Sequence, residues 1–496
     1  MSERRLALLI AAALFVTFAP VLVTPYAFTD DWTLLAQSLR GESFVSLAPP
    51  HLPGEPPALM NSLARGCPTS AYLTYWGFTA AHSLDNLRFL RVVAVLGIAL
   101  LAYLLLRALT RVGWPPGRAA ALALLICTLP PFQVEAAWSL SFSVPYSCVL
   151  AGLACRLTLR AAERPRWQEI AGALALLLVA VTIYQVTIMY FVVFAAIDLF
   201  RPDGSTDRLG HRLIWLAGMM IGGLFLGFIA YKIGLSLYGQ FLPPARSTFT
   251  HDIPGKLNYF VRGPFRDALQ LSKLWPVPYL PWIVGAFIGS GMFLYTRGPR
   301  GRRLLLLGLA AIMVPGIYLP NLLTAENWGA YRTQMGLASL LMVYTFFALH
   351  GWARTLGAVD WLLPIAAALA CMAATHNVIR YYAEPQMSEL RVMRAQLAGL
   401  NLAKVSRLNV IGTTYQSALN GALLDEFGLP SSAQPWARVP MVYSVVHEML
   451  GAPPSFPIVL APTSRGFRVP PGEALVDMSG LGRYATPEPL TTSRPR

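Results

Sequence analysis

Apolar runs of about 18 residues or more recur along most of residues 1–380. A helix of that length crosses roughly 30 Å of hydrocarbon. The composition agrees, because 55% of the residues are hydrophobic and 13% are charged, whereas a soluble domain carries about 25% charged residues. The sequence therefore predicts an all-α polytopic membrane protein.

We expect about eleven transmembrane helices. The run over residues 170–200 is too long for one span, so we interpret it as two short helices that turn near Thr182 to Gln185. An odd number of spans places the two ends of the chain on opposite sides of the membrane. The other nine spans are expected at about residues 6–23, 89–106, 119–130, 142–159, 213–235, 279–295, 304–319, 336–349 and 361–378.

Arginine clusters set the expected orientation. Arg4 and Arg5 precede the first span, and Arg297, Arg300 and Arg303 mark the strongest cluster between later spans. Positive residues are retained in the cytoplasm, so the N-terminus is expected there and the C-terminus in the periplasm. The formal net charge of +15 is explained by this orientation and by anionic lipid headgroups, which argues against a nucleic-acid partner.

Residues 381–496 contain no run long enough to span a membrane. Periodic patterns there predict a small extracytoplasmic α/β domain with a flexible tail, packed over the mouth of the membrane domain of residues 1–380. Asp425 and Glu426 are expected at a solvated helix end. The expected helices cover residues 384–403, 416–427 and 439–450, and the expected strands residues 408–411 and 458–460.

The sequence lacks the motifs of common soluble enzymes, namely GxxxxGK[ST], HExxH, GxSxG and paired CxxC. The expected cytoplasmic loops are also too short to form a nucleotide-binding domain. Any chemistry is therefore expected on the far side of the membrane, where ATP is absent and an activated donor would be lipid-linked.

Asp30, Asp31 and Trp32 follow the first span directly. One carboxylate at this position could act as a general base where a lipid headgroup meets an aqueous acceptor. Adjacent like charges raise one pKa, which favours such a role. The alternative is a solvated helix end beside an interfacial tryptophan.

Arg332 lies in a short far-side loop, where positive residues are disfavoured. A guanidinium there could bind a lipid phosphate through paired hydrogen bonds. The alternatives are an ion pair with Glu326 or an anchor to headgroups. Further phosphate contacts could come from the long loop before it, whose cations otherwise lie on the membrane surface: Arg246, Arg262 and Lys273.

Three polar residues stand in apolar surroundings: Glu135 between two expected spans, and Tyr184 and Gln185 at the expected turn. Such side chains either line a cavity or bond a neighbouring helix. Sugar binding and interhelix bonding both remain open for them.

Three motifs together resemble the polytopic C-type glycosyltransferases, particularly the O-antigen serotype-converting glucosyltransferase group. They are Phe28 to Trp32 after the first helix, Tyr184-Gln185 in the hairpin, and Tyr331-Arg332 at a helix start. The resemblance covers about residues 1–380. It implies that an acidic residue of the first extracytoplasmic loop is the catalytic base and that the donor is a polyprenyl-phosphate sugar.

The expected function is transfer of that sugar to a lipid-linked glycan or another envelope acceptor at the periplasmic face of a bacterial inner membrane. Asp30 or Asp31 would be the base, and Arg332 would hold the departing phosphate. A divalent metal, magnesium or manganese, could share that task. The alternatives are an O-antigen polymerase or ligase that relies on arginine without an aspartate base, a lipid-linked sugar flippase, and a non-catalytic scaffold.

Overall fold

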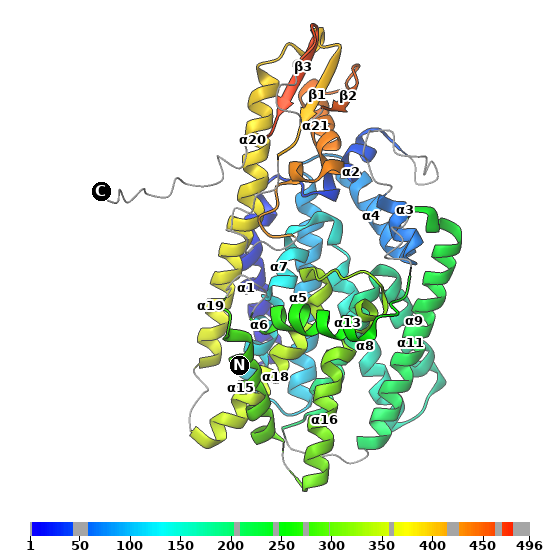
Figure 1. Cartoon of the computed structure of the whole chain (residues 1–496). Helices are drawn as coiled ribbons and strands as arrows, with labels where there is room; N and C mark the ends of the chain where they lie inside the picture. Colours follow the sequence, from blue (N-terminus) through cyan, green and yellow to red (C-terminus); the bar gives the residue numbers. More distant parts are fainter. Residues whose placement is uncertain are drawn as a thin grey trace, which may run out of the picture.

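The computed structural model describes residues 2–42, 58–202, 209–241, 248–270, 277–296, 298–356, 362–413, 426–461 and 469–479. Helices form a bundle, and a small sheet stands beyond one end of it (Figure 1). The first half of the chain provides α1 (Glu3–Val23), α2 (Asp30–Leu39), α3 (Ala58–Ala64), α4 (Pro68–Ala81), α5 (Leu87–Arg111), α6 (Pro116–Cys127), α7 (Pro130–Ala137), η1 (Ser139–Ser141), α8 (Val144–Glu163), α9 (Trp167–Ile183), η2 (Gln185–Met189), α10 (Tyr190–Leu199) and α11 (Leu209–Tyr238).

The second half continues the bundle and ends in the sheet. Its helices are η3 (Gly239–Phe241), α13 (Ile253–Phe260), η4 (Val261–Phe265), α14 (Arg266–Leu269), α15 (Leu280–Tyr295), α16 (Arg300–Gly316), α17 (Leu319–Leu323), η5 (Tyr331–Gln334), α18 (Met335–Leu356), α19 (Leu362–Val378), η6 (Ile379–Ala383), α20 (Glu384–Ala398), η7 (Leu402–Lys404), η8 (Ser431–Ala433) and α21 (Pro435–Leu450). The strands are β1 (Arg407–Ile411), β2 (Ile458–Leu460) and β3 (Glu473–Asp477).

Within the described residues, six helices are long and apolar enough to cross a membrane, and α6 and α7, bent by 63° at their junction, could make a seventh. The shorter apolar helices α9, α10 and α15 lie outside that set. The chain therefore has the helices of a membrane protein, and the number eleven stays a prediction. The six segments are Glu3–Val23, Leu87–Arg111, Ser139–Glu163, Leu209–Tyr238, Tyr331–Ala353 and Leu362–Ala398.

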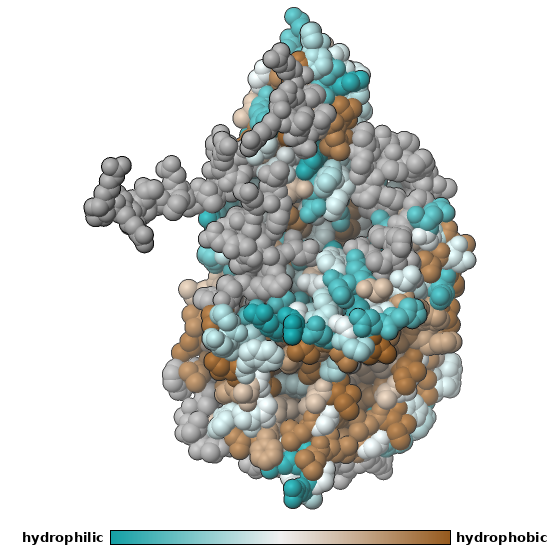
Figure 2. All heavy atoms as spheres, viewed as in Figure 1, coloured by the Kyte–Doolittle hydropathy of each residue, from teal (hydrophilic) through white to brown (hydrophobic). Residues whose placement is uncertain are grey.

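Several of these helices expose large apolar side chains. In Figure 2, hydrophobic residues cover much of the lower half of the visible face, and hydrophilic residues form a band above it and gather at the tip. Exposed apolar surface of this extent is costly in water and suits a hydrocarbon surrounding. The exposed residues include Leu8, Val16, Ile214, Ile221, Phe225, Ile312, Leu369 and Met372.

The two ends of the bundle are defined by the contacts of α5 with α1. Near the start of α5, Arg91 donates to the Thr24 carbonyl at the end of α1, whereas near the end of α5, Arg107 pairs with Glu3 at the start of α1. The two helices are thus antiparallel, and 25 residues separate the ends by about 37 Å. We call the end with Arg91 the sheet end and the end with Arg107 the arginine end.

The predicted break of residues 170–200 into two short helices is confirmed, whereas their crossing of a membrane stays a prediction. Helix α9 ends at Ile183, Tyr184 has extended backbone angles, and η2 leads into α10. Glu163 lies just before α9 and Asp198 near the end of α10, and both pair with Arg212. The run therefore starts and finishes at the arginine end, and Tyr184 lies at the far turn.

The C-terminal part forms a three-stranded parallel sheet in the order β2-β1-β3. Strands β1 and β2 and helices α20 and α21 match the predicted positions, whereas β3 is not anticipated from the sequence. The predicted helix over residues 416–427 falls almost wholly outside the described residues. Helix α19, the π-helical turn η6 and helix α20 form one continuous helix of 37 residues, Leu362–Ala398, which runs from the bundle toward the sheet (Figure 1).

Candidate active site at the sheet end

The predicted acidic pair stands at the first turn of α2, directly after the connection from α1. Thr29 precedes the helix with φ of 41°, and a positive φ is uncommon for threonine. The Thr29 amide donates to the Ser431 hydroxyl at 2.9 Å, which holds this turn from the C-terminal part of the chain. The position of Asp30 and Asp31 thus depends on residues about 400 positions away.

Asp31 is fully buried and accepts hydrogen bonds from backbone amides on two segments. The Leu140 amide donates to one carboxyl oxygen at 2.8 Å, and the Phe28 and Ser139 amides donate to the other at 3.1 and 3.4 Å. Burial raises the pKa of Asp31 to about 7, against the opposing effects of the Phe28 and Leu140 amides and of Arg91. Asp31 therefore links α2 to η1 through hydrogen bonds, and its carboxylate is not accessible at the surface.

Arg91 is a buried partner that sequence reasoning missed. Its guanidinium donates to the carbonyls of Val21, Thr24 and Tyr26 at 2.7 to 2.9 Å and to the Ser139 hydroxyl at 3.0 Å. These contacts satisfy carbonyls that the end of α1 leaves without helical partners. An arginine inside an apolar run is the signal that could have indicated it.

Asp30 is in a different environment from its neighbour. Its side chain is partly exposed, and one carboxyl oxygen accepts a hydrogen bond from the indole nitrogen of Trp436 at 2.8 Å. Trp436 comes from α21, which packs along α2. Of the two aspartates, Asp30 is the one that is not fully buried.

Arg332, in η5, lies over the rings of two tryptophans from other segments. Its guanidinium carbon is 4.5 Å from the ring centre of Trp138 and 4.7 Å from that of Trp328, within the range of cation–π attraction. Its Nε is 3.4 Å from a carboxyl oxygen of Glu426. Two indole rings and a carboxylate therefore contact this guanidinium.

The interpretation of Glu426 as a solvated residue is wrong. Glu426 is 2% exposed and, besides Arg332, accepts a hydrogen bond from the Tyr331 amide at 3.3 Å. Burial of a carboxylate is tolerated when a cation and hydrogen-bond donors face it. The sequence placed Glu426 near a glycine-marked helix end but gave no sign of its partner.

Trp138 connects the aspartates to Arg332. Its ring packs edge-on against Phe28 at 5.2 Å and carries Arg332 on its face. It directly precedes η1, whose amides donate hydrogen bonds to Asp31. The acidic pair and Arg332 are therefore joined by contacts through Trp138, and we call these residues one cluster.

Glu135 lies one helical turn before Trp138 and is fully buried. Neither carboxyl oxygen has hydrogen-bond geometry to any described residue, although the Ser141 hydroxyl and Arg332 act on it. A buried carboxylate without hydrogen bonds is costly. Glu135 is thus a ready acceptor for the hydroxyl groups of a ligand.

Tyr184 belongs to the same cluster, whereas Gln185 has a structural contact. The charged groups that act on the Tyr184 hydroxyl are Glu135, Arg332, Arg65 and Glu426. The Gln185 amide donates to the carbonyl of Arg65, which ties η2 to the segment after α3.

The remaining predicted residues lie apart from this cluster or outside the description. Trp32 is 1% exposed and packs in the hydrophobic core. Arg262 is exposed on η4, and the Glu326 carbonyl accepts a bond from the buried Lys256 ammonium at 2.6 Å. Arg246 and Lys273 lie outside the described residues.

Ser431, which holds Thr29, is itself anchored by α20. Glu389 accepts hydrogen bonds from the amides of Ser431 and Ser432 at 2.6 and 2.9 Å, and the Ser431 hydroxyl donates to Gln386 at 2.6 Å. The C-terminal part thus reaches the acidic pair through Ser431 and Trp436 and the arginine through Glu426.

In the described ranges, no group of three or more His, Cys, Asp or Glu side chains could hold a metal ion. No protein-family model matches the sequence, and no curated protein matches it either.

Proposed function

We propose that this chain is a membrane glycosyltransferase that moves a sugar from a polyprenyl-phosphate donor to a lipid-linked glycan or another cell-envelope acceptor, with its site on the periplasmic side. The observation that carries the proposal is the cluster at the sheet end. It combines a partly exposed carboxylate, an arginine over two indole rings, and a buried carboxylate that has no hydrogen bond of good geometry to the described residues.

Each of these groups has a chemical counterpart in the reaction. Indole rings stack on the apolar faces of sugars, and a guanidinium pairs with phosphate oxygens. Glu135 accepts hydrogen bonds from sugar hydroxyls. Exposed apolar faces on the neighbouring helices admit a substrate with a long hydrocarbon chain.

In the proposed step, Asp30 takes the proton of an acceptor hydroxyl as its oxygen attacks the anomeric carbon. The new carbon–oxygen bond forms on the face opposite the lipid phosphate, so the configuration inverts. The bond from the anomeric carbon to the phosphate oxygen breaks, and its electron pair stays on the phosphate. Arg332 stabilises that charge.

The test is sugar transfer by the purified protein from radiolabelled polyprenyl-phosphate sugars to envelope glycolipid acceptors. Asp30→Asn is expected to lower transfer by at least about 100-fold, the usual contribution of a general base. Asp85→Asn is the matched control, because Asp85 is an exposed carboxylate next to the start of α5 at the same end. Equal activity of the two variants would exclude Asp30 as the base.

One observation favours a second candidate, a polymerase or ligase that uses arginine without an aspartate base. Asp31 is occupied by backbone amides, so the acidic pair offers a single accessible carboxylate, whereas Arg332 is held firmly. For such an enzyme, Asp30→Asn retains transfer of preassembled lipid-linked glycans, while Arg332→Gln abolishes it.

A further inference from the structure

A second polar region lies at the arginine end, where Arg111 is about 30 Å along α5 from Arg91 beside the candidate active site. A cavity of about 40 Å³ opens there between α5, α8 and α10. Its polar lining consists of Arg107, Arg111, Arg156 and Asp198, and its apolar lining includes Leu104 and Phe194. A single water needs roughly 10–15 Å³ of such space, so the cavity has room for a small polyatomic group.

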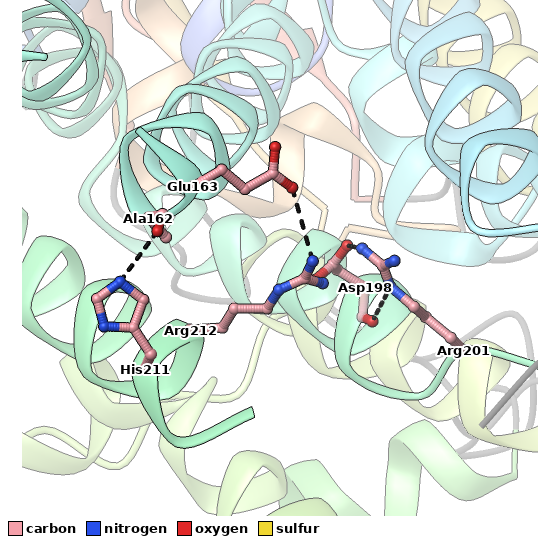
Figure 3. A network of polar contacts seen from close by, with 6 residues as sticks. All are labelled: Ala162, Glu163, Asp198, Arg201, His211 and Arg212. Atoms are coloured by element: carbon pink, nitrogen blue, oxygen red, sulfur yellow. Dashed lines mark hydrogen bonds and ion pairs between the residues drawn. The ribbon is translucent and has the colours of Figure 1, made fainter. Parts of the chain in front are cut away.

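The acidic residues near this cavity are already paired with arginines that lie elsewhere or at its rim. Figure 3 shows Arg201 and Arg212 converging on the carboxylate of Asp198, with Glu163 on the other side of Arg212. The Arg212 guanidinium is 3.0 Å from Asp198 and 3.6 Å from Glu163.

Glu3 is likewise engaged, since it pairs with Arg107 at 3.2 Å and accepts a hydrogen bond from Thr110 at 3.1 Å. Asp198 and Glu3 act on Arg111 from a distance, but their ion pairs among the described residues are with Arg201, Arg212 and Arg107.

Arg111, Arg156 and Arg160 make no ion pair or side-chain hydrogen bond with any residue that the structure describes. The Nε atom of Arg156 is buried and lacks an acceptor. These arginines act on one another as like charges, together with Arg107. A buried guanidinium nitrogen facing an excess of positive charge requires an anionic acceptor.

We infer that this cavity binds a phosphate-bearing anion, held by Arg111 and Arg156 at the arginine end of the bundle. Planar guanidinium groups bind phosphate oxygens in pairs, and the apolar rim with Leu104 and Phe194 suits the acyl region of a phospholipid. The same phosphate chemistry is offered by a phospholipid headgroup and by a free phosphate or phosphate ester. Basic pockets between membrane helices bind anionic headgroups in this way.

The experiment uses the full-length protein, purified in detergent and stripped of lipid. Retained lipid is measured by native mass spectrometry after addition of phosphatidylglycerol or phosphatidylcholine, and melting temperature is measured with the same lipids and with inorganic phosphate. The wild type is expected to retain phosphatidylglycerol over phosphatidylcholine. The double variant Arg111→Gln/Arg156→Gln is expected to bind phosphatidylglycerol about tenfold more weakly.

Arg164→Gln/Arg166→Gln is the matched control, because it removes the same charge from exposed residues between α8 and α9. The control is expected to bind like the wild type, and an equal loss in both double variants would overturn the inference. Arg111→Lys/Arg156→Lys keeps both positive charges, so it is expected to bind more lipid than the glutamine variant. This comparison still tests the site if the glutamine variant is poorly folded.

Stabilisation by inorganic phosphate as large as that by phosphatidylglycerol would identify a free phosphate as the ligand. Absence of both effects in the wild type would refute the site.

Discussion

At the scale of residues, Asp30 and Asp31 show how neighbouring identical side chains acquire different properties. They point in different directions from the first turn of α2, and one meets three amides while the other meets an indole at the edge of the cluster. The sequence predicted the acidic pair at the end of the first helix. It could not separate the two roles, because these depend on η1 and α21, which lie about 110 and 400 residues away along the chain.

Asp31 makes the stability of the protein depend on pH. Its pKa of about 7 in the folded state exceeds the value of about 3.9 for an unfolded chain. Between these values the folded state binds the proton more tightly, so the contribution of Asp31 to stability is present at low pH and is lost as pH rises from about 4 to about 7. The loss is at most about 1.4 kcal/mol per pH unit.

We expect the melting temperature of the wild type to fall more steeply across this window than that of Asp31→Asn, which cannot ionise. Thermal unfolding followed at several pH values in one detergent measures both slopes. Parallel slopes for the two proteins would contradict the assignment.

Arg332 depends on its planar shape as well as its charge. Arg332→Lys is expected to lower kcat/KM for the lipid-linked donor by about tenfold or more, because an ammonium cannot stack as a plane on the Trp138 and Trp328 rings or bind two phosphate oxygens in parallel. Arg262→Lys on η4 is the control, since Arg262 is exposed. A donor titration in the transfer assay measures both, and wild-type kinetics for Arg332→Lys would exclude the proposed phosphate contact.

At the scale of elements, hydropathy predicted the helices well because a lipid environment imposes long apolar runs. The break at Tyr184 was also visible, since 31 apolar residues between arginines exceed one span. The contacts between helices could not be predicted from the sequence. Arg91, Glu426 and Trp436 find partners from distant parts of the chain, and a single sequence contains no signal for such pairs.

Small residues set the close approach of α15 and α18. A Cβ added at Gly291 would lie 2.5 Å from the Cβ of Ala348, whereas one added at Gly289 would meet nothing within 4 Å. Packing of this kind brings membrane helices together where the hydrophobic effect contributes little.

Gly291→Ala is therefore expected to destabilise the protein by about 1–3 kcal/mol through overpacking, and Gly289→Ala is expected to be neutral or slightly stabilising because alanine favours helices. Melting temperatures of the two variants in the same detergent test this. A Gly291→Ala variant as stable as Gly289→Ala would show that the helices can move apart freely.

At the scale of the whole molecule, the sequence predicted a helical membrane part followed by an α/β part, and the structure has both kinds of element. The sequence suggested a change of composition near residue 380, yet the continuous helix Leu362–Ala398 crosses that position. The C-terminal part also contributes contacts to the site itself, through Ser431, Trp436 and Glu426. Amino-acid composition indicates whether a segment suits lipid or water. It does not indicate which segments contact one another.

The two ends of the chain are expected on opposite sides of the membrane, since Glu3 lies at the arginine end and the sheet lies beyond the other end. Alkaline phosphatase fused after Arg496 is expected to be active, and a fluorescent protein that folds only in the cytoplasm is expected to be dark there. The same reporters fused before Met1 should give the reverse result. Cytoplasmic fluorescence from the C-terminal fusion would contradict the proposed orientation.

The continuous helix that joins the bundle to the sheet is long enough for a small tilt at one end to displace the other end. At 37 residues it is about 55 Å long, so a tilt of about 10° at its base carries the far end by about 10 Å. Hydrophobic helices tilt to match the thickness of the bilayer around them, and Gln386 and Glu389, near the start of the α20 part of this helix, bond the Ser431 that holds the turn at Thr29. We therefore expect a change in bilayer thickness to shift the Ser431 contact and the turn before the carboxylate pair, and the π-helical turn η6, between α19 and α20, is where the helix can flex.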